Sequence, residues 1–450
     1  MSATGTGDVT SADLEIPLLG EARHPSPLAT APVERRSSLH WVGESDRVLF
    51  DDTLGIAAAR GVGIDELPAM EPGGPRRRLY FDPATVRAGV VSCGGLCPGI
   101  NDVVRGLVLQ LAQYGVPTVL GFRNGYRGLV PPLADDPMPL TEESVRGIDQ
   151  RGGSVLGTSR GAQDPEAIVD TLQHHGISVL FVIGGDGTLR GAGGIAAAAR
   201  ARGAGIAVVG IPKTIDNDIP YIDHSFGFQT AFARAAESIR AAQVEAAATP
   251  GGVGLVKLMG RHSGFIACYA SLACHDVDAV LIPEVPFALD GPGGVLAYVE
   301  RRLDEQGHAV VVLAEGAGQD LLDDPATTAA TDASGNARLA DIGGYLKGRL
   351  VGHFAGRGRD LNLRYVDPGY AIRSVPANGY DGVYCTRLAH AAVHAALSGR
   401  TEMIVGRWHG RFVHLPIDLV TGGRNLVDPD GDLWLTVLET TGQPAVFGDS

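Results

Sequence analysis

The sequence contains very little lysine and no excess of positive charge. Only three lysines, Lys213, Lys257 and Lys347, occur in 450 residues, so 34 of the 37 cationic side chains are arginines. Acidic residues number 51, and the formal net charge at pH 7 is therefore −14. A protein that binds nucleic acid needs a basic face, so we expect no nucleic-acid partner.

The sequence is also poor in cysteine and in long apolar runs. Five cysteines are few and odd in number, which favours a reducing compartment over a disulfide framework. Cys93 and Cys97 lie close together without a second Cys/His pair at zinc spacing, so we expect small buried residues there. Apolar runs such as 179–183 and 309–314 are too short to span a bilayer, and residues 1–8 do not resemble a signal peptide. We therefore expect a cytoplasmic protein without a membrane partner.

The composition divides the chain into regions. Residues 1–80 are rich in Pro, Ser, Gly and charge, so we expect a partly ordered N-terminal extension. We expect residues 81–400 to form the core and residues 401–450 to pack on it. In the core, short β-branched runs alternate with longer amphipathic stretches, which predicts parallel sheets covered by helices on both faces. The expected strands are 88–92, 118–122, 179–183, 206–211, 253–258, 279–282 and 310–314, and the expected helices include 102–114, 227–247 and 291–306.

Polar, glycine-rich clusters follow five of the expected strands directly. Ligands of open α/β sheets bind beyond the carboxyl ends of the strands, so the five clusters predict one composite crevice. The clusters are Gly94-Gly95, 184–188, 213–218, 259–261 and Glu315-Gly316.

The cluster Gly-Gly-Asp-Gly-Thr at 184–188 lies between an apolar strand and an Ala-rich helix. Glycines there allow backbone N–H groups to approach phosphate oxygens, and the helix N-terminus adds positive potential. Asp186 is the loop's single carboxylate and suits a Mg²⁺ ligand beside polyphosphate. A tight turn with Asp186 as helix cap is the alternative, and lipid kinases or nicotinamide-dinucleotide kinases also fit the bare motif. No Walker-type loop is present.

The cluster at 212–218, Pro-Lys-Thr-Ile-Asp-Asn-Asp, places two carboxylates two residues apart. In extended backbone Asp216 and Asp218 point the same way, so one could take a proton from an attacking hydroxyl while the other stays near a metal. Phosphoryl transfer needs little more than an oriented nucleophile and charge neutralisation. A polar turn without chemistry is the alternative.

Further along the chain, single charged residues suit an anionic, hydroxylated substrate. Arg261 follows a strand and suits a phosphoryl group, and Glu315 could accept hydrogen bonds from sugar hydroxyls. Arg364, Tyr370 and Arg373 are spaced to suit a sugar-phosphate group.

Taken in order, these motifs resemble the 6-phosphofructokinases over about residues 86–397. The motifs that carry the resemblance are VSCGGLCPGIND, GFRNGYRGL, LGTSRG, GGDGT, PKTIDND, FGFQTA, VKLMGRHSGF, PEVPF and AEGAGQ. The Pro-Lys-Thr form and the long leader look like the subgroup of plants and trypanosomatids, which also contains pyrophosphate-dependent relatives. The resemblance implies two doubly wound parallel-sheet domains that face an active-site crevice, one for nucleotide and one for sugar phosphate, with the chain crossing between them.

The resemblance also implies roles for single residues. Asp216 would be the general base for the 1-hydroxyl of fructose 6-phosphate, with Thr214, Asp218 and Arg261 as further catalytic residues, and Asp186 would bind Mg²⁺. The nucleotide-binding residues would be Gly95, Arg160, Gly161, Gly185, Asp186, Gly187 and Thr188. The sugar-phosphate-binding residues would be Thr214, Ile215, Asp216, Met259, Gly260, Arg261, Glu315, Arg364, Tyr370, Ala371, Ile372 and Arg373. Members of the family are commonly allosteric homo-oligomers, dimers or tetramers.

Two positions of the sequence bear on whether the phosphoryl donor is ATP or pyrophosphate. Gly187, with Gly191 after it, leaves room for the nucleotide α-phosphate where pyrophosphate users of the family carry Asp. Lys213 favours pyrophosphate weakly, because pyrophosphate-dependent members of the family carry a lysine there. The plant and trypanosomatid ATP enzymes carry it too, so Gly187 decides. We therefore predict ATP-dependent phosphorylation of fructose 6-phosphate to the 1,6-bisphosphate in glycolysis, with the pyrophosphate-dependent reaction as the alternative. A catalytically silent sugar-phosphate sensor is disfavoured because the residues it would have lost are all present: Asp186, Thr188, Asp216 and Asp218.

Overall fold

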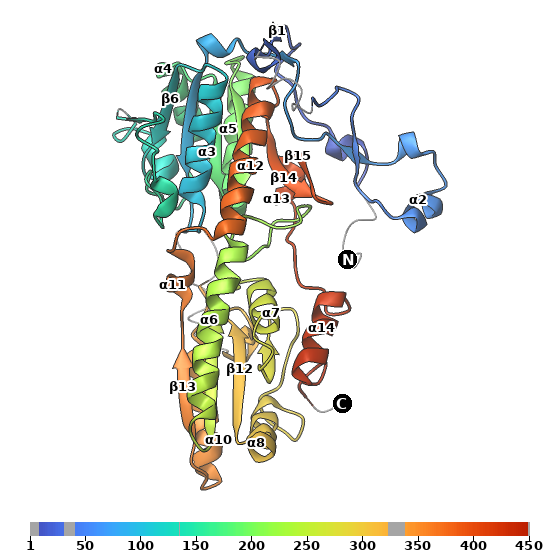
Figure 1. Ribbon diagram of the computed structural model, residues 1–450, viewed down its shortest axis with the longest axis vertical. Helices are drawn as coiled ribbons and strands as arrows, with labels where there is room; N and C mark the ends of the chain where they lie inside the picture. The colour runs from blue at the N-terminus through green and yellow to red at the C-terminus, as the bar shows by residue number, and fades with distance from the viewer. Residues whose placement is uncertain (1–8, 31–40, 135, 323–337, 449–450) are drawn as a thin grey trace.

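The computed structural model describes residues 9–30, 41–134, 136–322 and 338–448, which form two stacked lobes (Figure 1). The upper lobe contains a seven-stranded sheet in the order β15-β14-β9-β8-β5-β6-β7. Its strands are β5 Arg87–Ser92, β6 Thr118–Phe122, β7 Met138–Pro139, β8 Val179–Gly184, β9 Ala207–Pro212, β14 Met403–Trp408 and β15 Arg411–Pro416. The five central strands are parallel, and the edge strands β7 and β15 are antiparallel to their neighbours.

The lower lobe contains a parallel four-stranded sheet in the order β11-β12-β10-β13. Its strands are β10 Gly252–Leu258, β11 Ala279–Leu281, β12 His308–Ala314 and β13 Asn362–Val366. Four further short strands in the N-terminal region pair as β1 His24–Pro25 with β4 Arg78–Leu79 and as β2 Val48–Leu49 with β3 Ala69–Met70.

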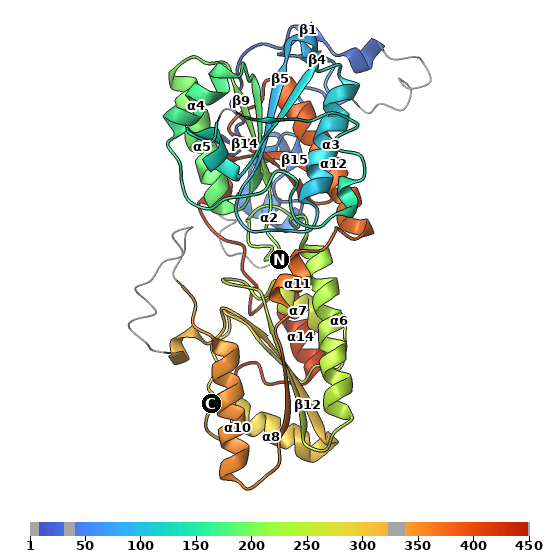
Figure 2. The same cartoon turned by 90° about the vertical axis from the view of Figure 1, so that its left-hand side faces the viewer.

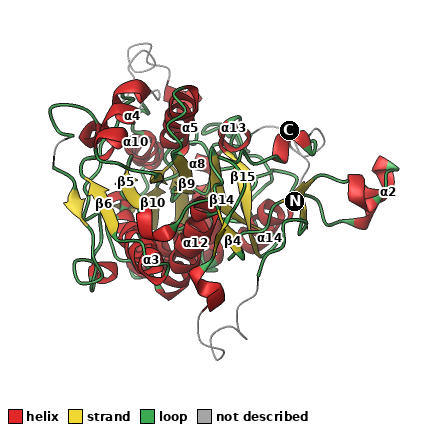
Figure 3. Ribbon diagram, turned by 90° about the horizontal axis from the view of Figure 1, so that it is seen from above, coloured by secondary structure: helices red, strands yellow, loops and turns green. Residues whose placement is uncertain are grey.

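Helices cover both faces of each large sheet, which confirms the predicted fold class (Figures 2 and 3). In the upper lobe α3 Ile100–Gln113 and α12 Gly379–Leu397 cover one face, and α4 Pro165–His174, α5 Asp186–Ala201 and α13 Ile417–Thr421 cover the other. In the lower lobe α6 Phe228–Ala247, α7 Phe265–Leu272 and α14 Asp432–Thr441 face α8 Val295–Gln306 and α10 Ile342–Gly356 across the sheet. The remaining helices are α2 Leu54–Arg60 and α11 Gly369–Arg373, with short 3-10 turns at η2 Ala12–Leu14, η3 Pro27–Thr30, η4 Ile64–Glu66, η5 Pro83–Thr85, η6 Gly125–Leu129, η7 Ile148–Gln150 and η8 Gln319–Leu322.

The central strands are apolar because both of their faces are covered. Every residue of β8 and β9 is buried, so neither strand alternates between apolar and polar residues. Cys93 and Cys97 are buried, as predicted, and burial raises the pKa of both thiols. None of the helices in the described part of the chain combines the length and apolarity needed to cross a membrane.

The chain passes between the lobes three times. It descends between β9 and α6, returns between α11 and α12, and descends again between α13 and α14 (Figure 1). Residues 403–416 therefore belong to the upper sheet, whereas α14 packs on α7 and β11 of the lower lobe. These crossings place the ends of strands from both sheets opposite each other.

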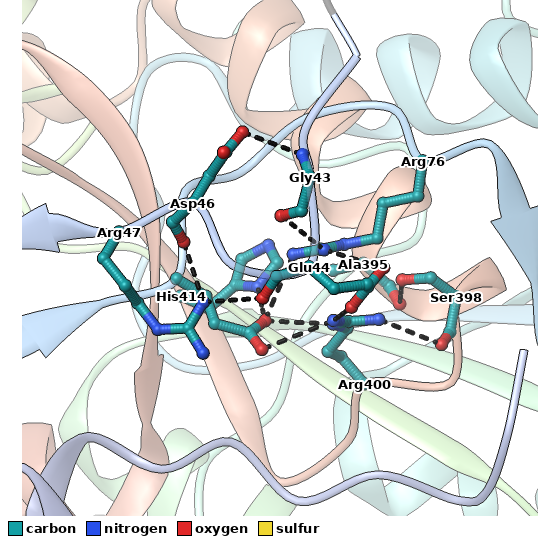
Figure 4. Close-up of polar contacts among 10 residues, drawn as sticks. Gly43, Glu44, Asp46, Arg47, Arg76, Ala395, Ser398, Arg400 and His414 are labelled. Carbon is teal, nitrogen blue, oxygen red and sulfur yellow. Dashed lines mark hydrogen bonds and ion pairs between the residues drawn. The ribbon is translucent and has the colours of Figure 1, made fainter.

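A partly buried ionic cluster attaches residues 41–80 to the upper lobe (Figure 4). The guanidinium of Arg400 pairs with Glu44 at 2.8 Å and with Glu71 at 3.0 Å. Arg76 pairs with the same two carboxylates at 3.0 and 3.3 Å, and His414 Nδ1 lies 3.2 Å from Glu71. Burial alone would raise the pKa of Glu71, but its hydrogen bonds to His414 and Arg400 outweigh that effect and lower it. The side chains of Arg76 and Arg400 are almost fully buried, whereas that of Glu44 is exposed, so the cluster reaches from the core of this region to its surface.

Candidate active site

A cavity of about 970 Å³ lies between the lobes at the carboxyl ends of the strands. All five polar clusters that the sequence places after strands contribute to its lining. They follow β5, β8 and β9 of the upper sheet and β10 and β12 of the lower sheet. One chain therefore brings residues of both sheets to a single cavity, as expected where parallel strands end at the same edge.

The loop after β9 holds two carboxylates in different surroundings. Thr214 Oγ1 donates to Asp218 Oδ1 at 2.8 Å and accepts from the Asp216 N–H at 3.1 Å. Asp216 Oδ2 lies 3.5 Å from the Arg261 N–H, and Ser263 Oγ donates to the Asp216 carbonyl at 2.7 Å. Asp216 Oδ1 is buried and accepts no hydrogen bond from the described residues. This oxygen therefore has an unused acceptor position in the wall of the cavity.

The backbone between the two carboxylates is turned rather than extended, contrary to the prediction from the sequence. Asn217 adopts a φ of 57°, in the left-handed region that Asn tolerates better than most residues. Its side-chain Oδ1 accepts the Ser225 N–H at 2.9 Å, which fixes the turn to the segment that leads into α6.

The charges around Asp216 favour its protonated form. Burial, and then the nearby carboxylates of Asp218 and Glu315, raise the pKa of Asp216. Burial also raises the pKa of Glu315, against the opposing charges of Lys257 and Arg261. A raised carboxyl pKa at the bottom of a cavity is typical of a group that exchanges protons.

The loop after β8 leads directly into α5. Gly185 precedes Asp186, the first residue of the helix, so free N–H groups and the positive helix end face the cavity. The guanidinium of Arg190, one turn later, pairs with Asp186 at 2.7 Å. A Cβ built at Gly187 would meet no atom within 4 Å, so this position opens onto free space.

Three cations converge on Gly95 after β5. The ammonium of Lys213 donates to the Gly95 carbonyl at 2.7 Å, and burial lowers the pKa of this lysine. A Cβ at Gly95 would lie 3.7 Å from Arg160 Nη2 and 3.7 Å from Arg373 Nη1. Arg160, predicted to bind the nucleotide, and Arg373, predicted to bind the sugar phosphate, are thus neighbours. Positive charge is therefore concentrated where two phosphorylated substrates would meet.

The close approach of two loops positions Glu315. A Cβ at Gly316 would lie 2.0 Å from the carbonyl oxygen of Arg261, so glycine is required for this contact. Glu315 and Arg261, which follow the neighbouring strands β12 and β10, are thereby held side by side in the cavity wall.

Some predicted residues lie elsewhere. Arg364 is half-exposed on β13, 3.6 Å from Glu245, and does not line the cavity. Gly260, Ala371 and Ile372 do not line it either, and Ile372 is part of the core. The other predicted residues line the cavity: Gly95, Arg160, Gly161, Gly185, Asp186, Gly187, Thr188, Lys213, Thr214, Ile215, Asp216, Asp218, Met259, Arg261, Glu315, Tyr370 and Arg373.

Four charged residues of the cavity wall were not predicted as site residues. Two of them, Lys257 and Asp367, pair with each other at 2.9 Å. The scarcity of lysine in the sequence was the only signal for Lys257. Arg190 lies one helical turn after Asp186, a spacing that could have identified it. Arg424 comes from the C-terminal segment, far from any of the motifs.

Comparison with known proteins gives consistent results. The family model "Phosphofructokinase" matches residues 87–396. The chain is 57% identical over 441 residues to "ATP-dependent 6-phosphofructokinase" of Amycolatopsis methanolica, covering 97% of this chain and 96% of that protein. It is 46% identical over 426 residues to "ATP-dependent 6-phosphofructokinase 7" of Arabidopsis thaliana, covering 94% of this chain and 86% of that protein.

Solved structures with the same fold are more distant in sequence. A pyrophosphate-dependent phosphofructokinase from Marinobacter aquaeolei superposes with a TM-score of 0.65 at 21% identity, covering 81% of this chain and 92% of that chain. The phosphofructokinase of Pichia pastoris in the T-state superposes with a TM-score of 0.63 at 22% identity, covering 79% of this chain and 37% of that chain. At this identity the likeness concerns the fold.

Proposed function

The chain belongs to the phosphofructokinase family, and from this premise we propose that it phosphorylates fructose 6-phosphate with ATP in glycolysis. The products would be fructose 1,6-bisphosphate and ADP. The observation that carries the choice of donor is the open space at Gly187, beside the N-terminus of α5. A nucleotide α-phosphate needs that space, whereas an aspartate there would fill it with negative charge.

The reaction assigns a distinct task to Asp216. Its Oδ1 would take the proton of the sugar 1-hydroxyl while the hydroxyl oxygen forms a bond to the γ-phosphorus. The bond from that phosphorus to the β,γ-bridging oxygen breaks, and ADP leaves with the electron pair. Burial of Asp216 and its unpaired oxygen support this role, since a base must face its proton directly.

Positive groups from both lobes would stabilise the transferring phosphoryl group. Arg261 lies beside the base, and Arg160, Lys213 and Arg373 surround Gly95. Such preorganised cations act most strongly where charge develops in the transition state and water is excluded. Glu315 would bind sugar hydroxyls, in keeping with its place in the lower-lobe wall.

Asp186 is the residue that would hold Mg²⁺. Among the described residues no group of three or more His, Cys, Asp or Glu could enclose a metal ion. Mg²⁺ usually binds through one or two carboxylates together with substrate phosphates, so a single carboxylate at the phosphate loop fits it. When bound, the ion would neutralise charge on the donor phosphates.

Three further proposals accompany this function. We propose a cytoplasmic location, for which the five free and buried cysteines are the support. A homo-oligomeric state, as dimer or tetramer, and allosteric control rest on membership of the family.

The donor is tested by a coupled assay of fructose 6-phosphate turnover with ATP or with pyrophosphate. We expect turnover with ATP, and turnover with pyrophosphate alone would establish the alternative reaction. In Gly187→Asp we expect kcat/KM for ATP to fall about tenfold or more, equivalent to about 1.4 kcal/mol, with KM for the sugar nearly unchanged.

Gly348→Asp is the matched control for that variant. Gly348 is an exposed glycine of α10, a Cβ at this position would meet no atom within 4 Å, and the residue does not line the cavity. It receives the same change in charge and should keep parental kinetics. An equal loss in both variants would contradict the assignment of Gly187 to the donor site.

A further inference from the structure

The segment that makes the last crossing between the lobes runs past the base. It is anchored to the loop after β9, because the Asn425 N–H donates to the Asp218 carbonyl at 2.9 Å and its side chain donates to the Asn217 carbonyl at 3.0 Å. It is anchored to the lower lobe as well, because the Val427 N–H donates to Glu284 at 2.8 Å. The same Glu284 oxygen accepts the Gly264 N–H at the start of α7. The segment is therefore held on both sides of the cavity.

These anchors place the side chain of Arg424 between two functional loops. Arg424 Nη1 donates to Asp218 Oδ2 at 2.8 Å, and Nη2 lies 3.9 Å from Asp186 Oδ2. One guanidinium thus reaches the carboxylate beside the base and the carboxylate at the phosphate loop. Its side chain is one-third exposed and lines the cavity, so it is accessible to substrates.

The two carboxylates depend on Arg424 to different degrees. Asp186 also pairs with Arg190, so it keeps a guanidinium partner if Arg424 is removed. Asp218 is held by the hydroxyl of Thr214 on one oxygen and by Arg424 on the other. Loss of Arg424 would therefore leave Asp218 with a neutral partner, beside a cavity that must accept the charges of two phosphorylated substrates.

We propose that Arg424 is a positioning residue for phosphoryl transfer. It fixes the Asp218 carboxylate next to Asp216 and places a positive charge between the base loop and the phosphate loop. This inference rests on the proposed function, because it assigns Arg424 to the step in which the donor phosphate meets the sugar hydroxyl. The residue lies outside the segment that the family model matches, which ends at residue 396.

The test compares Arg424→Gln and Arg424→Lys with the parent enzyme in steady-state kinetics with ATP and fructose 6-phosphate. In the Gln variant we expect kcat to fall about 100-fold, the usual effect of losing one preorganised charged donor, with KM for the sugar within about twofold. In the Lys variant kcat should be about tenfold higher than in the Gln variant, because lysine restores the charge but not the bidentate geometry of the guanidinium. Added guanidinium ion at millimolar concentration should partly rescue the Gln variant and leave the Lys variant unchanged.

A second measurement does not depend on turnover. Calorimetric titration with a non-hydrolysable ATP analogue should show about tenfold weaker binding in Arg424→Gln than in the parent. Arg411→Gln is the control, because Arg411 is an exposed arginine of β15 in the same lobe and does not line the cavity. It should match the parent in kinetics, binding and melting temperature.

The outcomes separate this inference from the proposed function. A parent enzyme that does not use ATP with fructose 6-phosphate would overturn the proposed function before any variant is made. With an active parent, a folded Arg424→Gln variant whose kcat stays within twofold overturns the role of Arg424. A Gln variant whose melting temperature falls well below that of Arg411→Gln, with no rescue by guanidinium ion, assigns Arg424 to stability instead and also overturns it.

Discussion

Asp216 has one buried carboxylate oxygen, Oδ1, without a hydrogen-bond partner among the described residues. Its second oxygen lies 3.5 Å from the Arg261 N–H. In Asp216→Asn the shape is kept and the proton acceptor is lost. We expect kcat to fall by about 10²–10⁴, with KM for fructose 6-phosphate nearly unchanged, in the coupled assay.

The control for this substitution is binding of fructose 6-phosphate by calorimetry, which should differ little between Asp216→Asn and the parent. A variant with nearly parental kcat would rule out Asp216 as the base. A variant that loses sugar binding together with kcat would show that its carboxylate binds substrate rather than moving a proton.

His394 on α12 gives a prediction about pH and stability. It is buried, its Nδ1 lies 2.8 Å from the hydroxyl of Tyr114, and burial lowers its pKa to about 3. In the unfolded chain its pKa is about 6.5, so protons bind preferentially to the unfolded state and stability falls as pH drops below 6.5. Between pH 7.5 and 5.5 we expect this residue alone to lower the free energy of unfolding by about 1.4 kcal/mol.

Urea unfolding of the parent and of His394→Gln at both pH values measures this contribution. The variant should be less stable at pH 7.5 but should lose about 1.4 kcal/mol less than the parent on acidification. Other buried histidines, such as His414, add to the pH dependence of both proteins equally, so the difference isolates His394. Parallel losses in the two proteins would contradict the assignment.

At the scale of elements, the sequence predicts a strand best where burial alone determines its residues. β8 and β9 are buried on both faces, so their apolar runs identify them to within one residue at either end. The hairpin of β14 and β15 was not predicted, because Arg407 and His414 interrupt its apolar pattern. His414 is tolerated there because it pairs with Glu71, a contact across more than 300 residues.

The two-residue turn of that hairpin contained a signal that could have been used. His409 and Gly410 both have positive φ, 48° and 77°, which is the backbone of a type I′ turn. A glycine in second position between two β-branched stretches is the usual sequence mark of such a turn. His409 made the turn hard to recognise, since Asn or Asp is the common first residue of a type I′ turn.

The residues of the site also differ in whether the sequence could predict them. Asp186, Asp216 and Arg261 could be predicted because each follows a strand directly, and parallel strands end at one edge. Arg424 could not, because its place depends on where a long connection crosses between lobes. Arg364 was predicted from spacing and lies on β13 beside Glu245, so its role in sugar-phosphate binding stays a prediction.

At the scale of the whole molecule, net charge and local charge differ in sign. The chain carries −14, yet Arg160, Lys213, Arg373 and Arg424 converge on the cavity between the lobes. Each comes from a different part of the chain, and the three crossings bring them together. Binding of anionic substrates therefore depends on the crossings as much as on the motifs.

The last crossing also carries α14 to the lower lobe, where it completes the core. Trp434 and Val437 are buried, and the side chain of Gln443 exchanges hydrogen bonds with the backbone of Val280 on β11 at 2.6 and 3.2 Å. In Trp434→Ala we expect the free energy of unfolding to fall by about 3–5 kcal/mol, because a large buried ring leaves a cavity. The measurement is urea unfolding beside Leu435→Ala, an exposed neighbour on the same helix that should change stability by less than about 0.5 kcal/mol. Equal effects of the two substitutions would mean that α14 rests on the lower lobe without stabilising it.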